Sequence, residues 1–219
     1  MAETSFKDRE KIEWSNTWLS EANCRTDRCL LIGDSLTREL RGRLEEVSKG
    51  WFQVDLFAAS FSITDKLFWS QFHCFLRGVC AEGYIYKYMV INYGFHHGFG
   101  LQCVMGGEDA YVFKERYREL IQVCKHVCKN VIIMNGSSMV LRNRIDIIDA
   151  EFEREILARN VAVKELAVEM GCKVFDVYGL LKEKEFKYVD HVHLERQAYV
   201  FMAQSLFDLF KLSGCESAK

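Results

Sequence analysis

Apolar and polar positions follow one another along the chain in blocks that predict strands and helices in turn. Short apolar runs bounded by turn residues predict buried strands, and they lie at residues 29–32, 51–58, 86–92, 131–135 and 173–177. Apolar residues every three or four positions predict helices. These begin after Gly33, with Leu36, Leu40 and Leu44 on one face, and recur at residues 65–77, 109–129, 146–170 and 194–212.

Strands that alternate with helices predict a parallel sheet with helices on both faces. We therefore expect an α/β fold, a three-layer α/β/α flavodoxin-like sandwich around a central parallel sheet of about five strands. A length of 219 residues suits one α/β domain, and no repeat or linker divides the chain. We expect a single domain over residues 1–219, with residues 1–27 as an N-terminal extension packed on it.

Charge and hydropathy narrow the class of partner. The formal net charge is −2 with basic residues spread along the chain, which argues against a nucleic-acid surface. No apolar run approaches the ~18 residues that a transmembrane helix needs. The first 25 residues carry charges at 7–11 and lack the apolar core of a signal peptide. A cytoplasmic location is the expectation, or a secreted or luminal one for a domain excised from a longer protein.

Nine cysteines are best interpreted as reduced thiols, since the number is odd and most lie in apolar surroundings. Two pairs, Cys24 with Cys29 and Cys74 with Cys80, stay open as disulfides for a secreted domain.

The string Cys124-x-His126-x-Cys128 has the residue types of a metal site. In a helix, however, His126 points roughly 200° away from the face that the two cysteines share. We therefore expect no metal and no cofactor.

The string Leu-Leu-Ile-Gly-Asp-Ser-Leu-Thr at residues 30–37 carries the strongest chemical signal. It places Asp34 and Ser35 between the end of a strand and the start of a helix. Free backbone N–H groups and the helix dipole gather there and stabilise a developing oxyanion. Ser35 is therefore a candidate nucleophile if a base can reach it. The alternative is that Ser35 only caps the helix, with Glu39 in its first turn.

A second signal lies near the carboxyl end, in Tyr-Val-Asp-His-Val-His-Leu at residues 188–194. Asp190 and His193 stand three residues apart, so the carboxylate can accept the Nδ1 proton and leave Nε2 free as a base. His191 is adjacent to Asp190 and is expected to point elsewhere. The alternative is that Asp190 caps the last helix and His193 is a surface residue.

Together, Gly33-Asp34-Ser35-Leu36 and Asp190-His191-Val192-His193 resemble the motifs of the SGNH (GDSL) hydrolase superfamily, over roughly residues 28–210. The resemblance implies Ser35 as nucleophile, His193 as general base and Asp190 as the carboxylate that orients it. The wider string Gly-Asp-Ser-Leu-Thr-Arg, with Arg38 three residues after the serine, looks most like the motif of the PC-esterase and trichome-birefringence-like branch. That branch acts on O-acetyl groups of glycans, as esterases or acetyltransferases.

The same resemblance implies an oxyanion hole that starts with the Ser35 N–H. The family's second-motif glycine has no counterpart after the second strand, where Ala59 or Ser60 would supply the backbone N–H instead. The third-motif asparagine is matched best by Asn92, and second best by His96 when the strings are aligned on Gly94.

The segment after the third strand is the expected specificity element. Gly94, Phe95, His96 and His97 combine a flexible backbone with rings that suit stacking on sugars. The alternative is a surface loop with buried phenylalanines. Asp34 and Arg38 complete the candidate substrate contacts.

These observations predict a serine esterase that removes O-acyl groups, O-acetyl first among them, from a carbohydrate or small ester through an acyl-enzyme. One alternative is an O-acetyltransferase that uses the same three residues to acetylate a glycan. A second is a catalytically inactive carbohydrate-binding pseudoenzyme, which the absent second-motif glycine keeps open. The expected partner is a glycan or small-molecule ester, and the oligomeric state is left open.

Overall fold

The structure, a computed structural model, describes residues 12–24, 26–93 and 108–216. Its centre is a sheet of six strands in the order β1-β3-β2-β4-β5-β8. In that order the strands are β1 (Ser15–Trp18), β3 (Gln53–Ala59), β2 (Arg28–Gly33), β4 (Tyr86–Asn92), β5 (Val131–Met134) and β8 (Lys173–Phe175). The five strands from β3 to β8 pair in parallel, and β1 pairs antiparallel with β3.

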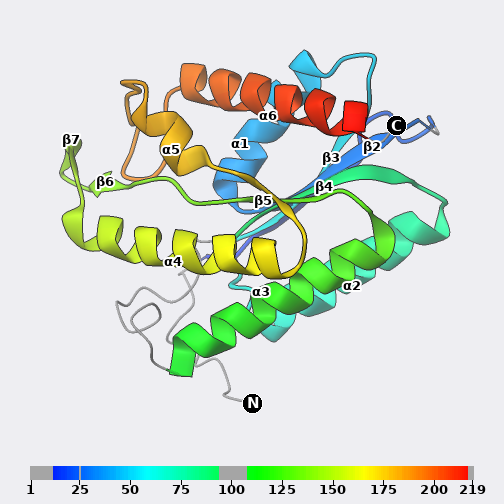
Figure 1. Ribbon diagram of the computed structural model, residues 1–219, viewed down its shortest axis with the longest axis horizontal. Helices are drawn as coiled ribbons and strands as arrows, with labels where there is room; N and C mark the ends of the chain where they lie inside the picture. The colour runs from blue at the N-terminus through cyan, green and yellow to red at the C-terminus, as the bar shows by residue number, and fades with distance from the viewer. Residues whose placement is uncertain (1–11, 25, 94–107, 217–219) are drawn as a thin grey trace.

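Helices cover both faces of this sheet and make three layers (Figure 1). One face carries α1 (Ser35–Val47), α5 (Val177–Lys182) and α6 (Arg196–Glu216), and the other carries α2 (Lys66–Ala81), α3 (Glu108–Val127) and α4 (Ala150–Glu169). Numbered along the chain, the five parallel strands β2, β3, β4, β5 and β8 stand in the order 2-1-3-4-5, as in flavodoxin-like folds. The expected α/β/α class and parallel core are confirmed.

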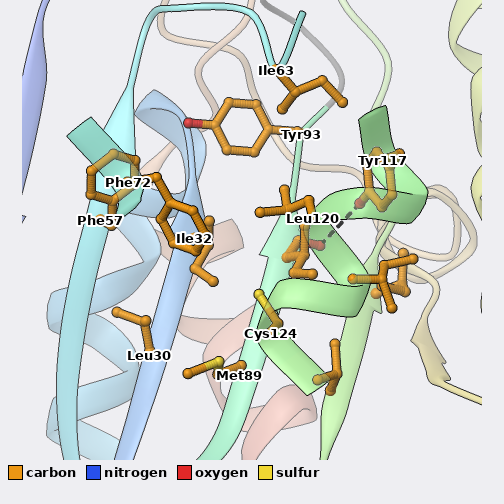
Figure 2. Packing of buried hydrophobic residues seen from close by; sticks show 14 of the residues in the cluster. Leu30, Ile32, Phe57, Ile63, Phe72, Met89, Tyr93, Tyr117, Leu120 and Cys124 are labelled. Atoms are coloured by element: carbon orange, nitrogen blue, oxygen red, sulfur yellow. Dashed lines mark hydrogen bonds between the residues drawn. The ribbon is translucent and has the colours of Figure 1, made fainter. Parts of the chain in front are cut away.

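Strand side chains alternate between the two helical layers, which explains the continuous apolar runs in the sequence. On β2, Leu30 and Ile32 belong to the cluster beneath α2 and α3, whereas Cys29 and Leu31 belong to the cluster beneath α1 and α6. Figure 2 shows part of the first cluster, with Ile32 of β2 and Leu120 of α3 both drawn among the buried side chains. Because both faces are buried, the central strands β2, β3 and β4 are mostly apolar along their length.

Two elements differ from the expected ones. The N-terminal extension supplies an edge strand, β1, in register with β3 from Ser15 opposite Ala59. Residues 146–148, expected to open a long helix, instead lie in a hairpin of β6 (Val140–Leu141) and β7 (Arg144–Ile148). β-Branched isoleucines favour the extended form there. The helix α4 begins only after Asp149, whose carboxylate accepts the first N–H groups.

Other boundaries agree with the prediction to within a few residues, and the short helix α5 was not predicted. No helix in the described ranges is long and apolar enough to cross a membrane. Seven cysteines of the described residues are free thiols: Cys24, Cys29, Cys74, Cys80, Cys124, Cys128 and Cys172. The disulfides considered for Cys24 with Cys29 and Cys74 with Cys80 are therefore not formed.

Candidate active site

The turn between β2 and α1 presents Ser35 at the carboxyl edge of the sheet. Asp34 is the N-cap residue, and its carboxylate accepts a hydrogen bond from the Leu36 N–H at 3.0 Å. A Cβ at Gly33 would lie 2.0 Å from Thr37 Oγ1, so only glycine lets the helix start this close to the strand. The backbone thus fixes Ser35 at the first position of α1, at the positive end of the helix dipole.

The Asp190–His193 loop has its own hydrogen-bonded frame. Asp190 Oδ1 accepts the backbone N–H groups of Val192 at 2.8 Å and His193 at 2.7 Å. The Val189 N–H in turn donates to the His193 carbonyl at 2.9 Å. These bonds bring the second carboxylate oxygen and the imidazole side by side, as the spacing of three residues predicts.

The loop and the turn meet through one continuous row of polar atoms. His193 Nδ1 lies 2.7 Å from Asp190 Oδ2, and His193 Nε2 lies 2.8 Å from Ser35 Oγ. Because an ionised carboxylate only accepts, Nδ1 carries the proton and Nε2 is left to accept from the serine. Residues 158 positions apart are thus arranged for proton transfer from the Ser35 hydroxyl to the imidazole.

The charge of Asp190 suits this arrangement. Partial burial acts to raise the pKa of Asp190, but the N–H groups of His193 and Val192 and the His193 ring outweigh it and lower the pKa to about 2. The carboxylate is therefore ionised at every pH where catalysis by a neutral imidazole is feasible.

Asn92 lies at the end of β4, with its amide hydrogen-bonded to neighbouring segments. Its Nδ2 donates to the carbonyls of Met134 and Asn135, both at 3.1 Å, and its Oδ1 lies 3.3 Å from Thr37 Oγ1. Both amide hydrogens are thus used to join the ends of β4 and β5, and the residue is 2% exposed. In this geometry Asn92 ties the strand ends together, and its expected role as oxyanion donor stays a prediction.

Three other candidates are also part of the scaffold. The Ser60 N–H donates to the Trp14 carbonyl at 3.0 Å, and Ala59 lies fully buried in β3 beside β1. Neither residue offers an N–H at the surface near Ser35. Asp34 is fully buried as the N-cap of α1, and its expected contact with substrate stays a prediction.

Arg38 remains as a side chain that can contact substrate. It lies one turn beyond Ser35 on α1, its side chain is 40% exposed, and its guanidinium lies 4.9 Å from the centre of the Trp14 ring. Trp14 is held there by its backbone N–H, which donates to Ser60 Oγ at 2.8 Å. No motif in the sequence pointed to Trp14, which reaches this edge only because β1 pairs with β3.

The four remaining candidates, Gly94, Phe95, His96 and His97, lie outside the described residues. Within the described ranges, no group of three or more histidine, cysteine or acidic side chains is placed to hold a metal ion. Cys124 and Cys128 are buried among apolar residues of the core.

The same fold occurs in known hydrolases. The structure matches a member of the lipolytic G-D-S-L family from Veillonella parvula with a TM-score of 0.60 and 18% identity, covering 85% of this chain and 99% of that chain. It matches the acetyl xylan esterase AlAXEase with a TM-score of 0.60 and 18% identity, over 83% of this chain and 98% of the other.

A third match is Axe2, an acetylxylan esterase from Geobacillus stearothermophilus, with a TM-score of 0.57 and 15% identity, over 83% of this chain and 93% of that chain. No protein-family model and no curated protein matches the sequence. The chain therefore has the fold of SGNH/GDSL hydrolases, at a sequence identity that shows the fold alone.

Proposed function

We propose that this protein is a serine esterase that removes acyl groups, O-acetyl groups above all, from a carbohydrate or small ester. The observation that carries the proposal is the row from Asp190 through His193 to Ser35, with heavy-atom distances of 2.7 and 2.8 Å. This row lies at the carboxyl edge of the parallel sheet, and α/β folds bind their ligands at that edge. Two of the matched folds belong to acetyl xylan esterases, which favours an acetyl ester.

In the proposed reaction, Ser35 Oγ attacks the ester carbonyl while its proton moves to His193 Nε2. Asp190 holds the ring with Nδ1 protonated and stabilises the imidazolium. The tetrahedral oxyanion is stabilised by the Ser35 N–H at the start of α1. The imidazolium then returns its proton to the leaving alcohol, and water hydrolyses the acyl-enzyme by the same route in reverse.

Arg38 is the proposed substrate contact next to the nucleophile, held against Trp14 with part of its guanidinium exposed. A planar fork of donors suits glycan hydroxyl and carbonyl oxygens. An arginine at the same position is typical of the PC-esterase-like motif Gly-Asp-Ser-Leu-Thr-Arg. The branch with this motif includes acetyltransferases as well as esterases. An O-acetyltransferase is therefore the second candidate, with a sugar hydroxyl in place of water.

The proposal is tested with purified protein and three substrate classes: p-nitrophenyl acetate, p-nitrophenyl esters of longer acids, and acetylated xylan fragments. We expect hydrolysis fastest with acetyl esters, and covalent labelling of Ser35 by a fluorophosphonate probe. Release of free acetate identifies an esterase, and transfer of acetyl to an added glycan identifies a transferase. A folded protein that neither hydrolyses nor reacts with the probe would be the pseudoenzyme instead.

A further inference from the structure

The base of the His193 loop is closed by a short antiparallel pairing. Tyr188 and Leu194 form a bridge, and outside it the Glu195 N–H donates to the Lys187 carbonyl at 2.8 Å. The Lys187 N–H donates back to Glu195 Oε1 at 2.9 Å. The two ends of the loop are thus joined, so we expect a displacement of Tyr188 to carry His193 with it.

Tyr188 also joins this loop to a separate segment of the chain. Its phenol donates to the Ser138 carbonyl at 2.9 Å, and beside it the Val140 N–H donates to the His191 carbonyl at 2.9 Å. Burial, with lesser effects of Glu153 and Tyr178, raises the pKa of Tyr188 to about 12. The phenol thus keeps its proton and stays a donor throughout the neutral range.

The segment that accepts this bond is itself fixed to the core. The Gly136 N–H donates to Asn160 Oδ1 at 2.8 Å, and Asn160 Nδ2 donates to the Gly136 carbonyl at 2.9 Å. A Cβ at Gly136 would lie 2.4 Å from Ile156 Cδ1, so the segment packs tightly on α4. Ser138 is therefore a fixed point against which the loop can be held.

We propose that Tyr188 is a positioning residue that holds His193 Nε2 at hydrogen-bonding distance from Ser35. The inference rests on the proposed esterase function for its kinetic consequence. Asp190 and His193 are 48% and 25% exposed at their side chains, so packing alone does not fix them. The phenol supplies one of the bonds that tie their loop to residues 138–140.

The test compares Tyr188→Phe with Tyr88→Phe. Tyr88 is the matched control because its buried phenol also donates to a backbone carbonyl, that of Phe210, at 3.0 Å. It lies near the start of β4, away from Ser35, and its ring stacks on Phe210, which phenylalanine retains. Each variant thus loses a single O–H group of the same kind.

In Tyr188→Phe we expect kcat for p-nitrophenyl acetate to fall on the order of 10-fold to 100-fold with KM unchanged, as for a small misplacement of a catalytic group. Tyr88→Phe should retain the parent kcat. Both variants should show a similar loss of thermal stability. Equal kcat values in the two variants would overturn the proposal.

A spectroscopic readout separates this proposal from the proposed function. The His193 Nδ1 proton, held by Asp190, should give a downfield proton resonance that exchanges slowly with water. Tyr188→Phe should broaden it, and Tyr88→Phe should leave it sharp. If the parent protein hydrolyses no ester, the esterase proposal fails, and an unchanged resonance in Tyr188→Phe would separately overturn the positioning role.

Discussion

After β2, Ser35 and the Asp190–His193 loop direct their polar side chains at each other. At the ends of the two flanking strands β4 and β3, Asn92 and Ser60 direct theirs into the scaffold, toward strand ends and the N-terminal segment. The two regions were expected to complete one site, the first as nucleophile and base and the second as oxyanion donors. They differ in their hydrogen-bond partners. Ser35 and His193 bond to each other, whereas Asn92 bonds to backbone carbonyls of the scaffold.

The difference shows what a buried amide does at the end of a strand. Asn92 is 2% exposed, and an unpaired donor there would cost about 1–3 kcal/mol. The nearby carbonyls of Met134 and Asn135 remove that cost by accepting the two amide hydrogens of Asn92. The same hydrogens would be needed to stabilise an oxyanion. His193 is partly exposed, and Asp190 holds its ring through Nδ1 alone, so Nε2 is left to Ser35.

The largest effect is expected from the nucleophile. Ser35→Ala should lower ester hydrolysis by about 10⁴-fold or more, and His193→Ala by a similar amount, because the members of such a row act as a unit. The fold should persist in Ser35→Ala, since Asp34 still caps α1. Initial rates with p-nitrophenyl acetate and a thermal melt check both points. Activity within a few-fold of the parent would place the chemistry elsewhere.

The next largest effect is expected from Asp190→Asn, with a fall in kcat on the order of 10³-fold to 10⁴-fold because the imidazole loses its fixed tautomer. His191→Ala is the contrasting variant and should stay within a few-fold. In the structure it is the carbonyl of His191, which alanine keeps, that bonds to Val140. A larger loss in His191→Ala than in Asp190→Asn would reverse the assignment of the base.

Asp190 also predicts a dependence of stability on pH. Its pKa is about 2 in the folded protein and about 3.9 in an unfolded chain, so folding favours the ionised form. The stabilisation is complete above about pH 4 and is lost as the pH falls through about 2. Urea unfolding of the parent and of Asp190→Asn should therefore differ at pH 7 and converge toward pH 2. A difference that persists at pH 2 would contradict this linkage.

The layers, the Gly-Asp-Ser turn and the Asp190–His193 pair could be predicted from the sequence because each depends on a local pattern. The pairing of Ser35 with a loop 158 positions away, by contrast, is expected only from the resemblance to SGNH hydrolases. The Gly-Asp-Ser turn follows from an apolar strand, a glycine and a helical period, and the Asp190–His193 pair from a spacing of three residues. The oxyanion donors depend instead on how strand ends meet. Whether Asn92 faces Ser35 or Asn135 is set by the parallel pairing of β4 with β5, which periodicity does not reveal.

The edge strand β1 escapes prediction for a similar reason. Ser15–Trp18 has only four residues, all of them exposed, so it lacks the apolar run that identifies a central strand. Part of the hairpin at Val140–Ile148 resembles a helix in the sequence because Ile147 and Ile148 continue the apolar pattern of α4. Only their β-branched side chains favour the extended form.

Asn92→Ala tests the comparison directly. Two carbonyls would lose their donors and Thr37 its partner, so we expect the free energy of unfolding to fall by about 1–3 kcal/mol. The kcat should fall by less than about tenfold in the folded variant, whereas loss of an oxyanion donor costs about 10²–10³. Thr37→Val, which removes one bond of the same network, should destabilise less. A stable Asn92→Ala protein that turns over at least about 10²-fold more slowly than the parent would support the oxyanion role.

The smallest effect is expected from Ser60→Ala. This variant tests whether Ser60, which stands where the family has its second-motif glycine, supports the scaffold or stabilises an oxyanion. Alanine keeps the backbone N–H that bonds to Trp14 and removes only the hydroxyl, which accepts the Trp14 backbone N–H at 2.8 Å and donates to Glu13 at 2.5 Å. The kcat for p-nitrophenyl acetate should stay within about twofold of the parent, with a loss of roughly 1 kcal/mol in the free energy of unfolding.

A glycan ester makes the Ser60→Ala test sharper, since Trp14 supports Arg38 beside the nucleophile. Loosening Trp14 should raise KM for acetylated xylan fragments a few-fold while leaving KM for p-nitrophenyl acetate unchanged, because only the larger substrate reaches Arg38. Arg38→Ala should give the same selective change with a larger rise in KM. An equal rise in KM for both substrates in Arg38→Ala would show that Arg38 acts on the ester group itself. In that case Ser60 would keep its scaffold role, and Arg38 would belong with the residues that act on the ester.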